Sequence, residues 1–444
     1  MPRSAVGPLI ASVVLIAVAG VILALSGASD EPQQVFAPAP TPTLGPEATV
    51  TPAAGATTAT RQGNVAVPAR PDAFADYAEA IAAYLSEAGE EALGPPCLAA
   101  LLDAWQMPPG DELLHPHGVS GGERCVMGNT DTDAEDEIVV VLTAEESLGL
   151  LSDVTVFDRG TKGYDVTFQW RGLDGVHQPF ISEIVSVGDI TGDGAGELVY
   201  ATNWCGASTC TLNVFVVAGR SGKYERLDTS ADVPELPSDI AMATAEVRVE
   251  DTDGDGTMEI VLHGGIIQSA AAGPQRMRTE VYGWNGQLFS LTSSENDPSP
   301  LRYFKVRDAD EAFSQGDYEQ AAGLYQEAID GTGLEEVTWL GSREELTAYS
   351  TFRLGLSYLK FGDTKAAAQQ VNAAIANYPV SLHGKVAMAF RNAISLNQGG
   401  YSGQLSAGCD AVSDFASQNL DRFREVWDYG WANPDFEADA LCPF

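Results

Sequence analysis

A long apolar run near the start of the chain is the first strong feature of its pattern. Residues 9–25 carry no charge, follow Arg3, and precede Asp30 and Glu31. The run is near the ~20 residues needed to cross a bilayer and exceeds the apolar core of a cleaved signal peptide. Its flanking charges predict a cytoplasmic N-terminus. We expect residues 1–30 to form a membrane anchor with the rest of the chain outside the cytoplasm; the alternative is a cleaved signal peptide and a secreted protein.

The pattern changes twice before residue 118. Residues 31–72 are rich in Pro, Thr and Ala and contain few residues that could build a core, so we expect a disordered, fairly stiff stalk. Residues 73–117 instead place Phe74, Tyr77 and Ile81 at three- and four-residue steps. This spacing gives one apolar stripe and predicts a small helical cap.

Three similar segments follow and decide the interpretation of residues 118–296. They start at Asn129, Asp189 and Asp251, which are 60 and 62 residues apart. Each begins with an acidic loop, runs into a β-branched apolar stretch, and continues into two apolar stretches separated by a glycine turn. Such alternation predicts antiparallel hairpins, so we expect each repeat to be a small sheet of about four strands.

From residue 297 to residue 444 the apolar period becomes helical. Gly316-Asp317 and Gly362-Asp363 each separate two apolar stripes containing alanines and aromatic residues. Small residues let paired helices approach closely, and aromatic residues fill the gaps between them. The pattern predicts stacked helical hairpins.

Charge and cysteine content restrict the class of protein further. The net charge of −38 repels nucleic acid phosphates, which excludes a nucleic-acid partner, and attracts divalent cations. Six cysteines in an exported chain favour disulfides. Because they fall close together in sequence, the expected pairs are Cys97 with Cys125, Cys205 with Cys210, and Cys409 with Cys442.

The acidic loops carry the candidate metal chemistry. In the third, carboxylates stand at positions one, three, five and nine, and Gly256 permits a sharp turn. Calcium prefers six to eight hard oxygen ligands, so this spacing predicts a Ca²⁺ site. An EF-hand is excluded because its twelfth position would be Leu262, inside an apolar strand. The expected ligands in the three loops are Asn129, Asp131, Asp133 and Glu137; Asp189, Thr191, Asp193 and Glu197; and Asp251, Asp253, Asp255, Thr257 and Glu259.

Catalytic motifs are weak by comparison. Residues 118–122 match G-x-S-x-G, but a His-Pro-His-Gly loop precedes them where a nucleophile elbow needs a strand. His115 and His117 in that loop are a minor candidate for a metal site. The sequence contains no phosphate-binding loop and no dinucleotide fingerprint. We therefore expect a protein that is not an enzyme.

Two resemblances follow from these motifs. A D-x-D-x-D-G-x-x-E loop before an apolar strand resembles the FG-GAP/VCBS repeats of integrin-α-like β-propellers, over residues 118–293, which implies bound calcium. Propellers close with about four or more blades, so either degenerate strands complete a ring or the sheets stay open under flanking helices. The helical hairpins resemble tetratricopeptide repeats, which implies a protein partner. The expected fold class is multidomain α and β, with propeller-like repeats, a C-terminal α-solenoid and an N-terminal anchor.

Taken together, these features lead us to expect a membrane-anchored extracytoplasmic calcium-binding protein that acts as a protein-interaction or scaffold module. The alternative is a carbohydrate-active or other extracellular hydrolase that uses the β-repeats as a binding module. For the partner surface we expect Arg353, which lies off the packing stripe of its helix, to be exposed on the inner face of the solenoid. Trp339, in an insertion between hairpins, would overhang that face, or alternatively pack over the gap between the hairpins.

Overall fold

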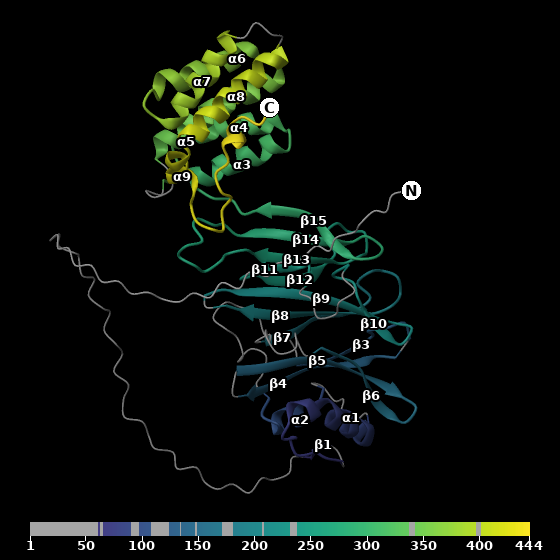
Figure 1. The fold of residues 1–444 in the computed structure, drawn as a ribbon. Helices are drawn as coiled ribbons and strands as arrows, with labels where there is room; N and C mark the ends of the chain where they lie inside the picture. Colours follow the sequence, from purple (N-terminus) through teal and green to yellow (C-terminus); the bar gives the residue numbers. More distant parts are fainter. Residues whose placement is uncertain are drawn as a thin grey trace, which may run out of the picture. The chain divides into compact units, whose positions relative to one another are not determined.

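The computed structural model shows sheets followed by helices (Figure 1). It describes residues 61–62, 65–89, 97–107, 124–133, 135–146, 149–170, 181–206, 208–230, 238–336, 342–396 and 401–444. Within these ranges no helix combines the length and apolar character needed to cross a membrane. The predicted anchor lies outside the described residues, as do most of the predicted stalk and the loop containing His115, His117 and Ser120.

A small cap precedes the sheets. It consists of β1 (Arg61–Gln62), β2 (Val65–Ala66), a 3-10 turn η1 (Phe74–Asp76), α1 (Tyr77–Ala88) and α2 (Ala99–Ala104). The predicted apolar stripe is confirmed, since Tyr77 and Ile81 are buried in the core of the cap. The Cys97–Cys125 disulfide joins the cap to the first sheet.

Three antiparallel sheets of four or five strands follow, as the repeat pattern predicts. Sheet one contains β3 (Cys125–Gly128), β4 (Glu137–Glu146), β5 (Gly149–Gly160) and β6 (Gly163–Trp170). Sheet two contains β7 (Ile181–Gly188), β8 (Glu197–Cys205), β9 (Cys210–Arg220), β10 (Lys223–Arg226) and β11 (Ala241–Ala243). Sheet three contains β12 (Glu246–Glu250), β13 (Glu259–Gly264), β14 (Arg278–Trp284) and β15 (Phe289–Asn296).

The sheets pack face to face as successive layers (Figure 1). In β4, Ile138 and Val140 face the cap, whereas Val139 and Val141 face sheet two. This alternation follows from the two-residue period of a strand and explains why the run is continuously apolar. Sheet two is likewise buried on both faces. Among the described residues, no core cluster contains both sheet one and sheet three, so these sheets do not meet to close a ring.

The helical region has one core of its own. Its helices are α3 (Arg302–Ser314), α4 (Tyr318–Asp330), α5 (Arg343–Phe361), α6 (Thr364–Asn377), α7 (Leu382–Leu396), α8 (Tyr401–Gln418) and α9 (Leu420–Trp427), with a 3-10 turn η3 (Ala438–Leu441). Asp317 caps α4 and Asp363 caps α6 through side-chain hydrogen bonds, each directly after a glycine with positive φ. The two glycine–aspartate signals therefore form the same local turn, as the sequence predicts.

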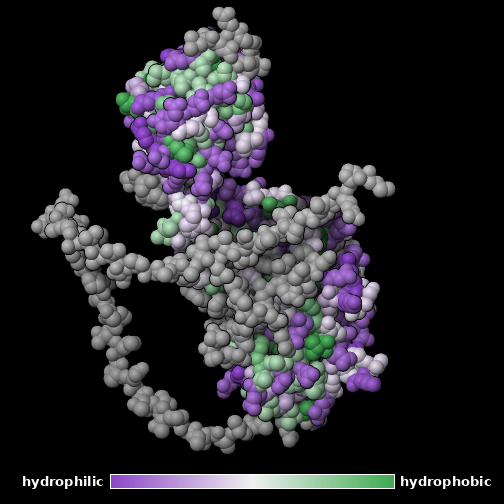
Figure 2. Space-filling model, viewed as in Figure 1, coloured by the Kyte–Doolittle hydropathy of each residue, from purple (hydrophilic) through white to green (hydrophobic). Residues whose placement is uncertain are grey.

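All three predicted disulfides are present. Cys205–Cys210 joins the end of β8 to the start of β9, and Cys409–Cys442 ties the C-terminal segment to α8. Figure 2 shows hydrophilic residues gathered along one side of the sheet region, whereas hydrophilic and apolar patches alternate on the helical region.

Candidate metal centre

Two of the three acidic loops bring carboxylates together. We call residues 129–137 loop one, 189–197 loop two and 251–259 loop three. In loops one and three, a ligand atom from each of three side chains lies within 4.8 Å of the other two. These groups are Asp131, Asp133 and Glu137 in loop one, and Asp251, Asp253 and Glu259 in loop three.

Loop three acquires its shape from hydrogen bonds of its first aspartate. The Asp251 carboxylate accepts the N–H of Gly254 at 2.7 Å and of Gly256 at 3.2 Å. Both glycines have positive φ, 81° and 92°, where other residues are strained. Asp253 Oδ1 in turn accepts the N–H of Asp255 at 3.1 Å. The loop thus turns sharply around its own carboxylates, leaving lone pairs free to bind an ion.

The glutamate that ends loop one carries the clearest evidence in that loop. Glu137, the first residue of β4, is 0% exposed. Its Oε2 accepts the N–H and the hydroxyl of Thr130 at 2.6 and 2.9 Å, but its buried Oε1 has no hydrogen-bond partner. An unpaired buried carboxylate oxygen is costly, and a divalent cation would remove that cost. The residues therefore fit a metal.

The pKa of Glu137 is raised, as expected for a buried carboxylate with an unpaired oxygen. Burial raises the pKa above its ordinary value, and the charges of Asp131 and Asp158 act in the same direction. The hydrogen bonds from Thr130 oppose the shift but do not cancel it. A cation in the loop would favour the ionised carboxylate.

In loop three, Glu259 occupies the same position and is held in the same way. It is 7% exposed, and its Oε2 accepts the N–H and hydroxyl of Thr252 at 2.7 and 2.6 Å. Asp255, which the sequence predicts as a ligand, lies outside the carboxylate group; its Oδ1 accepts the N–H of Thr257 at 2.7 Å. The close group is therefore smaller than the predicted ligand set.

Loop two is built differently. Although Asp189, Asp193 and Glu197 were all expected as ligands, the structure does not bring them into a group like the other two. Asp193 instead forms a 3.1 Å ion pair with Arg220 of β9. Thr191 stands where loops one and three have an aspartate, and its N–H and hydroxyl point to Glu197. Burial raises the pKa of Glu197 to about 7.

Two residues outside the loops were missed by the sequence analysis. Arg220 supplies loop two with a positive charge from the protein itself. Asp158 of β5 is a further carboxylate near loop one. Burial raises its pKa, and the negative charges of Asp133 and Asp131 raise it further. Both residues shortly precede a hairpin turn: Asp158 lies two residues before the end of β5, and Arg220 is the last residue of β9.

The predicted partner-binding residues have different outcomes. Trp339 lies outside the described residues. The prediction of an exposed Arg353 is wrong: it is 3% exposed, and its guanidinium lies 3.8 Å from the centroid of the Phe313 ring. It donates to the Tyr325 hydroxyl at 3.0 Å and to the Ala440 carbonyl at 3.0 Å. The C-terminal segment covers the face of α5 that was expected to be open.

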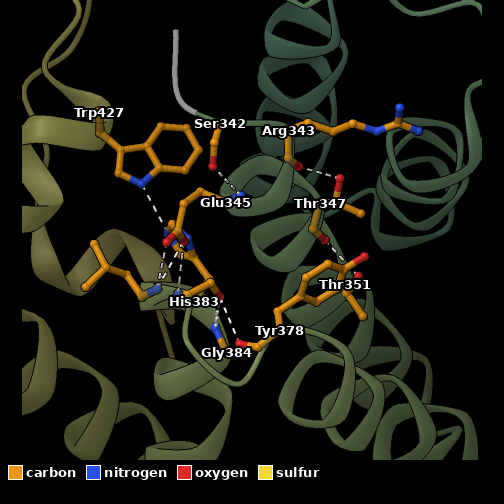
Figure 3. Close-up of polar contacts among 11 residues, drawn as sticks. Ser342, Arg343, Glu345, Thr347, Thr351, Tyr378, His383, Gly384 and Trp427 are labelled. Carbon is orange, nitrogen blue, oxygen red and sulfur yellow. Dashed lines mark hydrogen bonds and ion pairs between the residues drawn. The ribbon is translucent and has the colours of Figure 1, made fainter. Parts of the chain in front are cut away.

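A second buried polar cluster joins three helices of the same region (Figure 3). Glu345 of α5 accepts the N–H of Leu382 at 2.8 Å and pairs with His383 Nδ1 at 2.8 Å. Trp427 Nε1 donates to His383 Nε2 at 3.1 Å. Burial alone would raise the pKa of Glu345, but the hydrogen bonds from His383 and Leu382 lower it overall. Because His383 is 0% exposed, we interpret this cluster as a structural link between α5, α7 and α9.

Comparisons with protein-family models, curated proteins and solved structures find no match to the chain. The class of the protein is set by its own architecture: antiparallel sheets, each with an acidic loop before its second strand, followed by packed helices. In two of those loops the side chains could hold a metal ion.

Proposed function

We propose that the chain is an extracytoplasmic calcium-binding protein that is anchored to a membrane by its N-terminal segment and acts as a protein-interaction scaffold. The observation that carries the calcium proposal is the buried, unpartnered Oε1 of Glu137 within a group of three carboxylates. Oxygen-only ligands in a flexible loop suit Ca²⁺ better than the strict octahedron of Mg²⁺. The role proposed for the ion is structural, and the chain is proposed not to be an enzyme.

The architecture supports the FG-GAP/VCBS-like interpretation of the sheets. Each sheet contains a meander in which the acidic loop joins its first two strands. The repeated glycine–aspartate turns before α4 and α6 support tetratricopeptide-like hairpins, which commonly bind protein partners. Arg353 is buried and is not proposed as part of the partner surface.

Disulfides support the proposed location. All six cysteines are paired, and disulfides are rare in the cytoplasm of mesophiles. The anchoring role of residues 9–25 rests on their apolar pattern alone.

Calcium binding is tested directly on the full-length protein. Calorimetric titration after chelation should show two ions per chain, one for each carboxylate group. Calcium at one hundred times Kd should raise stability by about 2.7 kcal/mol per site, measured by thermal melting. Asp133→Asn and Asp253→Asn should each weaken one site, whereas Glu319→Gln removes the same charge from an exposed position in α4 and should change neither. Absence of both heat and stabilisation in the wild type would refute the proposal.

A further inference from the structure

Loop one lies directly against sheet two. The carbonyl of Asp131 accepts the N–H of Gly196 at 2.8 Å, and the carbonyl of Thr130 accepts the N–H of Gly219 at 2.8 Å. Gly196 N–H also lies 3.1 Å from Asn129 Oδ1. Three consecutive residues of the candidate metal loop are therefore hydrogen-bonded to the next repeat.

Glycine is required on the sheet-two side of this contact. A Cβ atom at position 196 would lie 2.0 Å from the carbonyl oxygen of Asn129. A Cβ atom at position 219 would lie 2.4 Å from Cβ of Asp131. Real atoms do not approach so closely, so any side chain at either position would push loop one away from sheet two.

A hydroxyl relay connects a candidate ligand to the same sheet. The Thr130 hydroxyl donates to Glu137 Oε2 at 2.9 Å. Its oxygen lies 2.6 Å from the hydroxyl of Tyr224 in β10, which must then be the donor in that contact. Thr130 is 0% exposed, so the hydroxyl at the centre of the relay is shielded from water. The position of Glu137 and the contact with sheet two are thus set by the same residue.

We infer that a calcium ion in loop one acts as a latch that locks sheet one to sheet two; this inference rests on the proposed calcium binding. An ion held by Asp131, Asp133 and Glu137 fixes the loop backbone between them. The carbonyl that accepts from Gly196 is that of Asp131 itself, and the one that accepts from Gly219 belongs to the preceding residue, Thr130, whose hydroxyl also binds Glu137. Opening the contact between the sheets then requires release of the ion, so the calcium concentration controls how strongly the two sheets are coupled.

Loop three is a matched control within the same chain. It has an equivalent carboxylate group, but the side chains of Asp251 and Asp253 hydrogen-bond only inside the loop in the described structure. One backbone bond, from Met258 N–H to the Ile190 carbonyl at 2.9 Å, joins the loop to the preceding repeat. Removing its ion should therefore leave the contact between sheets one and two unchanged.

The test is hydrogen–deuterium exchange of the full-length protein, resolved to the amides of Gly196 and Gly219, with calcium and with chelator. At one hundred times Kd, calcium should slow exchange of both amides about a hundredfold, because opening that requires ion release is suppressed by 1 + [L]/Kd. Glu137→Gln should abolish this slowing. Asp133→Asn, at an exposed position where folding is not at risk, should do the same, whereas Glu259→Gln should retain it.

The outcomes separate this inference from the proposed function. If calorimetry detects no calcium binding, the proposed calcium-binding function and this inference are both refuted. If calcium binds in loop one but exchange at Gly196 and Gly219 is unchanged, only the latch is overturned. Slowing that survives in both Glu137→Gln and Asp133→Asn also overturns the latch, because the protection would then come from another site.

Discussion

Replacing Arg353 with alanine should destabilise the helical region, contrary to the mild effect expected of an exposed partner-binding residue. This side chain of α5 is buried between α3, α4 and the C-terminal segment. Truncation removes its hydrogen bonds to the Tyr325 hydroxyl and to the carbonyls of Ala440 and Leu441, as well as its contact with the Phe313 ring.

The size of the effect follows from the carboxylate that is left behind. Arg353 Nε lies 3.6 Å from Asp310 Oδ1, and the Asp310 side chain is 17% exposed. Breaking a buried charge pair costs about 3–5 kcal/mol. We expect the lower end, about 3 kcal/mol, because Tyr325 and Tyr349 still donate to Asp310. Arg307 also remains 4.0 Å from this carboxylate. A loss of this size is a large part of the total stability of a domain, about 5–15 kcal/mol.

Urea denaturation of the full-length variant, followed by tryptophan fluorescence and near-ultraviolet circular dichroism, measures this loss. Arg343→Ala is the matched control, since that side chain is 64% exposed and lies 3.9 Å from Glu336. An exposed pair of this kind contributes about 0–1 kcal/mol. Equal stability of the Arg353→Ala and Arg343→Ala variants would refute the buried placement and restore Arg353 as a candidate surface residue.

Further predictions concern single features of the sheets and of the C-terminal segment. Arg220→Gln should free Asp193 and let loop two bind calcium, raising the calorimetric stoichiometry from two to three; an unchanged value would show that the arginine does not block the site. Burial raises the pKa of Glu183 to about 8, so the folded state keeps a proton that the unfolded state loses near pH 4.5. Stability should therefore fall as pH rises through that window, and Glu183→Gln should flatten the profile in melts from pH 4.5 to 8. Replacing both Cys409 and Cys442 with serine should cost about 3–4 kcal/mol in urea denaturation, because the disulfide closes a loop with a sequence separation of 33 residues; an unchanged midpoint would contradict this.

Local sequence signals predicted much of the fold. The acidic loops and β-branched runs indicated three sheets because both signals depend on neighbouring residues alone. The cysteine pairs were close enough in sequence to be matched by proximity. Asp317 and Asp363 marked helix starts because an N-cap is also a local interaction.

Predictions that depended on distant parts of the chain were less successful. Helical periodicity placed Arg353 off one packing stripe, but it could not show that the segment containing Ala440 covers the other face. The loop motif predicted three similar metal sites, but the neighbouring charge at loops one and two comes from another strand. Asp158 and Arg220 reach the loops through strand pairing, and the motif does not include them.

The separate cores between the sheets have a consequence for how this region could change in length. Each sheet buries residues only against its immediate neighbours, and the described part of the chain shows no core shared by sheets one and three. In a closed ring, an added blade would alter the angle at every interface. In an open series of layers, duplication of a repeat adds one new interface and leaves the existing ones unaltered. The number of repeats is therefore free to vary by duplication in the middle of the series, whereas the cap that covers sheet one can be used only at an end.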